Sequence, residues 1–150
     1  MCQIRVSSIL VTIMTSNPDV DYIINWIRHG SRVSQPEIDS ALHQHDINGN
    51  TMLHAAAYSG NLKIIQRCVE EDLDVNAAGN MCKNTPLHCA TMTGQSLAVD
   101  MLLTSGANPN QVDRFNETPI DVAEKGGDLV VRNLLLAHLV HKRVMQFIQK

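Results

Sequence analysis

Thr85-Pro86-Leu87-His88 opens a helix, and this stretch decides the fold because near-copies of it stand one repeat away on either side. The earlier copy is Thr51-Met52-Leu53-His54, and the later one is Thr118-Pro119-Ile120-Asp121. The spacing of the three threonines is nearly constant, with 85 − 51 = 34 and 118 − 85 = 33. A fixed period of this size is typical of a solenoid built from stacked helical repeats.

Small residues keep the same register in all three copies. They are Ala56, Ala90 and Ala123, and then Gly60, Gly94 and Gly127. Each threonine is a good N-cap, and a proline at the first helical position loses no hydrogen bond. Each glycine follows a short helical run, where a left-handed backbone conformation ends the first helix. The aliphatic second helix that follows can bury its apolar side only by stacking on neighbouring repeats.

Residues 46–137 resemble the ankyrin repeat, whose pattern is a turn, Thr-Pro-Leu-His, a small pair, a glycine, an aliphatic helix and Gly-Ala-Asp-Val-Asn. The resemblance implies an all-α fold, an ankyrin-repeat solenoid of stacked helix-turn-helix units with short finger hairpin loops. It also implies that His54 and His88 steady the turns through hydrogen bonds. Four positions depart from the pattern: Met52 replaces proline, Arg67 an aliphatic residue, Lys83 the turn glycine and Asp121 histidine.

This register divides the chain into six segments. We expect an N-terminal tail, disordered, at 1–17; a degenerate first repeat or N-terminal cap at 18–45; ankyrin repeats at 46–79, 80–112 and 113–137; and a C-terminal capping helix or tail at 138–150. Inside the N-terminal cap, apolar residues at helical spacing predict helices over 20–29 and 36–44. The apolar series of residues 129–148 is longer than one repeat helix requires, so it predicts either a cap over the last repeat or a partner or dimer surface.

The N-terminal stretch 4–14 is apolar, but Ser7, Ser8 and Thr12 interrupt it and no small-residue cleavage site follows. We therefore expect no signal peptide. The stretch is also shorter than the roughly 20 apolar residues that cross a bilayer. A further hypothesis is that translation starts at Met14 and gives a shorter protein. The intact mass of the native protein tests this hypothesis.

Composition narrows the class of protein further. The 150 residues are 44% hydrophobic but only 3% aromatic, which predicts an aliphatic and alanine-rich core. A net charge of −3 offers no basic surface for nucleic acid. The cysteines Cys2, Cys68, Cys82 and Cys89 form no C-x-x-C pair. We therefore expect thiols in a reducing compartment and an intracellular protein, cytoplasmic or nuclear or both.

No catalytic, cofactor-binding or metal-binding motif stands out. His43 and His45 lack a carboxylate or thiol at ligand spacing, so we interpret them as a solvated pair and not as a zinc site. Cys82 falls in a finger loop, expected to be exposed, where a redox role is a weak alternative. The sequence contains no phosphate-binding glycine loop and no nucleophile turn. We predict that the protein is not an enzyme and binds no cofactor or metal.

The resemblance places a binding surface on the finger turns and on the exposed side of each first helix. The positions are Ile47, Asn48, Asn50, Tyr58, Met81, Cys82, Asn84, Met92, Arg114, Phe115, Glu117 and Lys125. Three finger tips are apolar, namely Ile47, Met81 and Phe115, although such tips are normally water-soluble. Aromatic, Met and Arg residues are enriched in the cores of protein interfaces. An alternative for Phe115 is that its ring folds onto its own hairpin.

The leading hypothesis is a non-enzymatic, intracellular protein–protein interaction module. In this hypothesis it acts as a stoichiometric regulator, an inhibitor or regulatory subunit of a partner such as a kinase or a transcription factor, bound on the concave surface. The partner is another protein, with no nucleic acid and no membrane. Two alternatives stay open: a self-assembling scaffold that forms a homodimer through the C-terminal helix, and a pathogen-derived ankyrin effector that mimics a host regulator.

Overall fold

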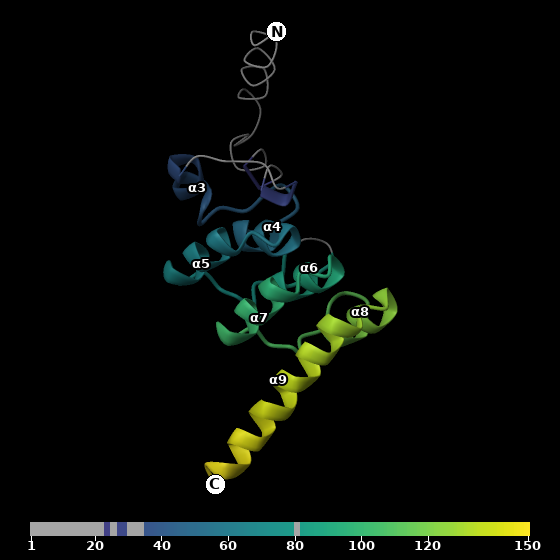
Figure 1. Ribbon diagram of the computed structural model, residues 1–150. Helices are drawn as coiled ribbons and strands as arrows, with labels where there is room; N and C mark the ends of the chain where they lie inside the picture. Colours follow the sequence, from purple (N-terminus) through teal and green to yellow (C-terminus); the bar gives the residue numbers. More distant parts are fainter. Residues whose placement is uncertain (1–22, 25–26, 30–34, 80–81) are drawn as a thin grey trace, which may run out of the picture.

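The computed structural model describes residues 23–24, 27–29, 35–79 and 82–150. Within these residues the chain forms seven named helices and no named strand (Figure 1). The helices are α3 (Gln35–Ala41), α4 (Met52–Ser59), α5 (Leu62–Glu70), α6 (Pro86–Met92), α7 (Ser96–Thr104), α8 (Pro119–Gly126) and α9 (Leu129–Ile148). The expected tail at 1–17, the alternative start at Met14 and the finger residue Met81 lie outside the described residues.

The helices stack in two layers, as an ankyrin-repeat solenoid requires. First helices pack on first helices, α4 on α6 and α6 on α8, while second helices pack on second helices, α5 on α7 and α7 on α9. Within one repeat, the first helix also packs on the second, as α4 does on α5. Finger hairpins connect the repeats, with isolated bridges pairing His45 with Thr51 and Gly79 with Asn84. The predicted all-α solenoid is confirmed.

The first helices begin at the residues that the sequence predicts. Thr51, Thr85 and Thr118 are the N-caps of α4, α6 and α8, each in an extended conformation with a capping box. The predicted chain reversal after each first helix is also present. Its glycines Gly60, Gly94 and Gly127 have φ of 70°, 67° and 70°.

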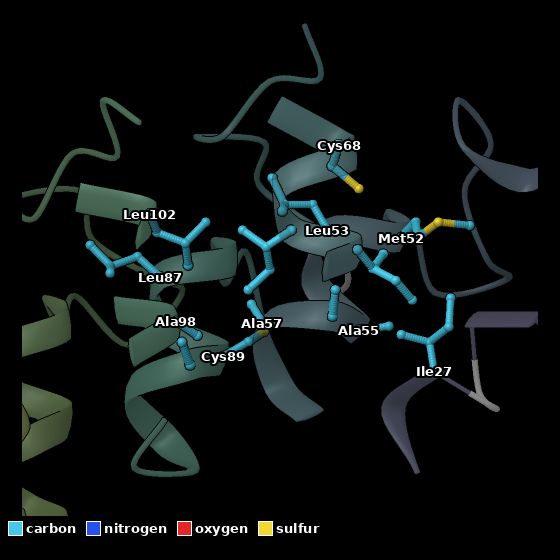
Figure 2. Close-up of a cluster of buried hydrophobic side chains, with 14 of the residues drawn as sticks. Ile27, Met52, Leu53, Ala55, Ala57, Cys68, Leu87, Cys89, Ala98 and Leu102 are labelled. Atoms are coloured by element: carbon cyan, nitrogen blue, oxygen red, sulfur yellow. The ribbon is translucent and has the colours of Figure 1, made fainter. Parts of the chain in front are cut away.

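The core is aliphatic and runs along the whole stack. Leu53 of α4, Leu87 of α6 and Leu102 of α7 are buried near one another, with alanines and cysteines around them (Figure 2). The small alanines allow neighbouring helices to approach closely, while the leucines fill the space between the two layers. The core therefore belongs to the stack as a whole and not to any single repeat.

The described residues of 18–45, the expected degenerate first repeat or N-terminal cap, bury apolar side chains in the same core as the first full repeat. Ile38, Ala41 and Leu42 are buried as expected, although α3 spans Gln35–Ala41 and not 36–44. Buried Ile23, Ile24 and Ile27 continue the core beyond α4, and Figure 2 shows Ile27 beside Ala55.

Arg67, which departs from the repeat pattern, contacts this cap. Its guanidinium lies 3.6 Å from Asp39 of α3 and 3.0 Å from Glu71. At this half-exposed position the charged side chain links α5 to α3.

The C-terminal end differs from the expected arrangement. Helix α9 runs without a break from Leu129 to Ile148, so residues 138–148 continue the second helix of the last repeat and form no separate cap. Only Val131 and Leu135 of α9 are buried. Residues 140–150 are all exposed, and the helix extends away from the stack (Figure 1).

Candidate protein-binding surface

The finger loops are held by an aspartate at the base of each described hairpin. In the first finger, Asp46 accepts hydrogen bonds from the backbone N–H groups of Asn48 (2.9 Å) and Asn50 (2.7 Å). In the third finger, Asp113 accepts from Phe115 (2.8 Å) and Glu117 (3.0 Å) in the same way. Such local side-chain bonds fix a tight turn without a strand ladder.

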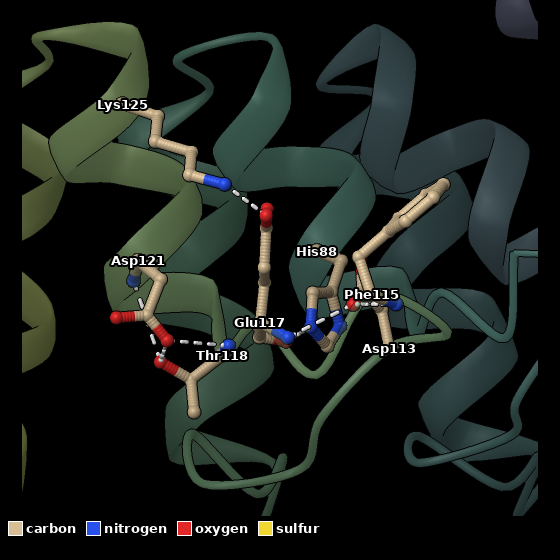
Figure 3. A network of polar contacts seen from close by, with 7 residues as sticks. All are labelled: His88, Asp113, Phe115, Glu117, Thr118, Asp121 and Lys125. Carbon is tan, nitrogen blue, oxygen red and sulfur yellow. Dashed lines mark hydrogen bonds and ion pairs between the residues drawn. The ribbon is translucent and has the colours of Figure 1, made fainter.

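The apolar finger tips stand in solvent. Ile47 is 83% exposed and Phe115 is 66% exposed. Figure 3 shows the ring of Phe115 pointing away from the hydrogen-bonded groups of its own hairpin. The ring of Phe115 is therefore mostly exposed, and whether it anchors a partner stays a prediction.

One histidine on each of the first helices α4 and α6 connects that helix to the next finger. His54 Nδ1 accepts from the N–H of Thr51 (3.1 Å), and Nε2 lies 2.9 Å from the carbonyl oxygen of Asn84. Because Nδ1 accepts a backbone proton, Nε2 carries the ring proton and donates it across to that carbonyl. His88 repeats the arrangement with Thr85 and the carbonyl of Glu117 at 3.1 Å (Figure 3). The turn-steadying role expected for both histidines is confirmed.

This geometry requires neutral imidazoles. Burial lowers the pKa of His54 from 6.5 to about 4, and burial also lowers the pKa of His88. Gly79 lies beside the imidazole of His54. A Cβ on Gly79 would lie 2.7 Å from His54 Nε2, so the lack of a side chain there leaves room for the ring. The fingers are thus fixed in position by the helices behind them.

The predicted site residues separate into three groups. Ile47, Asn48, Tyr58, Met92, Arg114, Phe115 and Lys125 are exposed on the concave surface, which consists of the finger turns and the outward sides of α4, α6 and α8. Cys82, Asn84 and Glu117 are half-buried there. Asn50 differs from expectation, because it is only 4% exposed and its side-chain amide donates to Asp46 (2.9 Å). Asn50 therefore acts within the finger.

Polar contacts brace this surface between repeats. The N–H of Arg114 donates to the carbonyl of Cys82 (2.8 Å), which joins the second and third fingers. Lys125 of α8 pairs with the carboxylate of Glu117 (Figure 3). The hydrogen bond to Glu117 raises the pKa of Lys125, so this cation is charged at neutral pH.

A hollow of about 380 Å³ opens between the first two fingers and their helices. It is lined by Arg28, Asn48, Asn50, His54, Tyr58, Cys82, Asn84, Cys89 and Met92. The sequence analysis missed Arg28, whose guanidinium lies 3.6 Å from Asp46. No local motif marks this arginine, and only the packing of the N-terminal cap brings it to the hollow.

The described thiols and histidines outside the finger contacts differ in burial. Cys68 and Cys89 are buried, and burial raises the pKa of each to about 12. Cys82 is half-buried, whereas exposure was expected. His43 and His45 are exposed, as a solvated pair should be. Among the described residues, no three His, Cys, Asp or Glu side chains lie close enough to hold a metal ion, and no helix is long and apolar enough to cross a membrane.

A family model described as three copies of ankyrin repeats matches residues 14–113, two-thirds of the chain. The chain belongs to the ankyrin-repeat family. The match begins earlier than the resemblance at 46–137 and ends at the start of the third recognised repeat. Ankyrin repeats are a non-catalytic fold that binds other proteins, so this ankyrin-repeat protein is a protein–protein interaction module.

Similar repeats occur in parts of several longer proteins. The human ARF GTPase-activating protein GIT2 is 36% identical over 75 residues, 50% of this chain and 10% of that protein. The chicken nuclear factor NF-kappa-B p105 subunit is 34% identical over 98 residues, 62% of this chain and 10% of the relative. Human B-cell lymphoma 3 protein is 36% identical over 84 residues, 52% of this chain and 18% of the relative. The chain thus matches about a tenth to a fifth of each relative.

Proposed function

We propose that this ankyrin-repeat protein binds one partner protein on its concave surface and regulates it stoichiometrically, as an inhibitor or regulatory subunit. The observation that carries the proposal is the row of exposed apolar side chains on this surface: Ile47, Tyr58, Met92 and Phe115. Large apolar and aromatic side chains that protrude from a rigid frame are typical anchors of protein interfaces.

The rigid frame is the second support. The backbone and histidine bonds fix the fingers before a partner arrives, so little ordering entropy is lost on binding. The hollow beside Tyr58 and Met92 offers a concave position for an anchor of the partner.

For the class of partner we propose a transcription factor or a protein kinase. Similar repeats occur in a protein named as a nuclear factor subunit, which favours the first of these. We also propose an intracellular location, because the buried thiols of Cys68 and Cys89 suit a reducing compartment.

The test is affinity capture from native cells with quantitative mass spectrometry, using the wild type and an Ile47→Glu, Phe115→Glu double variant. A matched control is Leu97→Glu, which introduces the same charge at an exposed apolar position of α7 away from the concave surface. All variants are first compared by circular dichroism and thermal melting. Partners lost only from the double variant support the proposal, and sedimentation of the purified complex gives the stoichiometry. Identical partner lists for all three proteins contradict it.

The homodimer through the C-terminal helix is a separate hypothesis. Sedimentation velocity over a dilution series tests it directly. A concentration-dependent dimer supports it, and a monomer at all concentrations excludes it over that range.

A further inference from the structure

In the stack, the second helix of one repeat is covered by the second helix of the next repeat. One side of helix α9 has no such cover among the described helices. Leu103 of α7 and Leu136 of α9 occupy the same repeat position, since 136 − 103 = 33 is one repeat period. Leu103 is 3% exposed, and α9 packs on α7. Leu136 is 36% exposed, and no described element packs on that side of α9. Helix α9 thus covers this position on α7, whereas no described helix covers the equivalent position on α9.

The open side of α9 carries five exposed apolar side chains, with the polar Asn133 between the first two. Leu129, Leu136, Val140, Val144 and Phe147 are spaced by 7, 4, 4 and 3 residues, which places them on one face of a helix. All five are exposed, Phe147 most of all at 83%. We call these five residues the α9 stripe. At 1.5 Å per residue the stripe is about 27 Å long.

The charge of this helix is opposite to that of the rest of the chain. Residues 129–150 contain four basic residues and no Asp or Glu, which gives +4. Residues 1–128 contain eight basic and 15 acidic residues, which gives −7, and the two parts add to the net −3. Arg143 lies on one flank of the stripe, and Lys150 follows the C-terminal end of α9. Neither has an ion-pair partner among the described residues.

These features select among three occupants. A second copy would bring another +4 helix against the stripe, with no acidic side chain on α9 to meet it. An anionic membrane would attract α9 but repel the −7 remainder of the chain, and α9 carries no Trp or Tyr to anchor it at a lipid interface. An acidic helix fits both the charge and the shape, since a helix covers the equivalent position on α7.

We propose that the α9 stripe docks an amphipathic helix of a partner protein, with acidic side chains facing Arg143 and Lys150. Apolar contacts along the stripe supply affinity, and the opposite charges fix which helix binds and in which register. This surface is separate from the concave surface. The protein therefore joins two partners, one on the fingers and one on α9.

The probe is a labelled synthetic peptide of three heptads with Leu at positions a and d and Glu at e and g. A matched peptide carries Lys at e and g. Fluorescence anisotropy with the full chain measures both affinities. We expect the Glu peptide to bind at least about tenfold more tightly than the Lys peptide.

Variants locate the site. Val144→Ser with Phe147→Ser should weaken the Glu peptide at least about tenfold, whereas the matched exposed control Leu97→Ser should leave binding unchanged. Arg143→Glu with Lys150→Glu should reverse the preference toward the Lys peptide. Ile47→Glu with Phe115→Glu should not affect peptide binding, so failure of this proposal is distinguishable from failure of the concave-surface proposal.

Three results overturn the inference. The first is equal or absent binding of both peptides. The second is a concentration-dependent dimer that Phe147→Ser abolishes, which would assign the stripe to a second copy. The third is cosedimentation with vesicles of phosphatidylcholine that contain phosphatidylserine as the minor, anionic component. If the same variant abolishes that cosedimentation, the stripe belongs to lipid.

Discussion

Helices α7 and α9 are the second helices of consecutive repeats, yet only one of them is enclosed. Helix α7 has nine residues and lies between α5 and α9, with Ala98, Val99, Leu102 and Leu103 buried. Helix α9 has 20 residues and packs on α7 and α8 from one side, with only Val131 and Leu135 buried. Similar leucine-rich sequences thus become core or surface according to their neighbours, as expected where stability resides between repeats.

The largest effect is expected when the stability of Leu103→Ala is compared with that of Leu136→Ala. We expect Leu103→Ala to lower the free energy of unfolding by about 2–5 kcal/mol, because it leaves a cavity between packed helices. Leu136→Ala removes the same atoms from a half-open position and should cost about 1 kcal/mol or less. Urea denaturation followed by circular dichroism measures both. Equal losses would show that α9 is covered in solution.

Acid should destabilise the histidine-braced repeats before it affects the last one. The pKa of His54 is lowered from 6.5 to about 4 in the folded protein, so the unfolded chain binds the proton more tightly. Stability is therefore complete above pH 6.5 and declines as the pH falls towards 4, by up to about 3 kcal/mol for this residue. In the last repeat Asp121 replaces the histidine, and its hydrogen bonds from Thr118 lower its pKa below 3.8. Its contribution is lost only in stronger acid.

Denaturant titrations at pH 7 and pH 4.5 test this difference. His54→Asn should flatten the pH dependence, because it removes the buried imidazole. An unchanged pH profile in His54→Asn would show that other groups carry the acid sensitivity.

The three finger turns differ in how well their residues suit the backbone. Gly49, Lys83 and Asn116 occupy equivalent positions and have φ of 78°, 53° and 62°. A lysine in this left-handed region is strained, whereas Asn tolerates it and Gly has no penalty. Lys83→Gly should therefore raise the free energy of unfolding by about 1 kcal/mol, and Asn116→Gly by less. Denaturation midpoints compare the two, and a destabilised Lys83→Gly would refute this explanation.

The smallest effect on stability is expected at a finger tip. Phe115→Ala should change the free energy of unfolding by no more than about 0.5 kcal/mol, because the ring is exposed. The same change should weaken partner binding if Phe115 is an anchor. Thermal melting and partner capture on one preparation separate the two roles. A stability loss near that of Leu103→Ala would place Phe115 in the core.

Much of the fold was accessible from sequence because its signals are local. Threonine caps, the glycines after each first helix and the fixed repeat period identify the repeats without tertiary information. The exposed tips Ile47 and Phe115 followed from the same register. Arg28 did not, because no local motif marks it within the degenerate first repeat or N-terminal cap, and it reaches the hollow only through the packing of that segment.

Sequence alone therefore determined the repeat, the threonine N-caps of α4, α6 and α8, and the glycines that follow these helices. The tertiary structure decided the rest: that Asn50 is turned inward to Asp46, that Arg67 holds the cap and that α9 continues past the stack with one side open. The physical reason is the range of the interactions. Caps and turns depend on residues a few positions apart, whereas burial depends on which helix lies alongside.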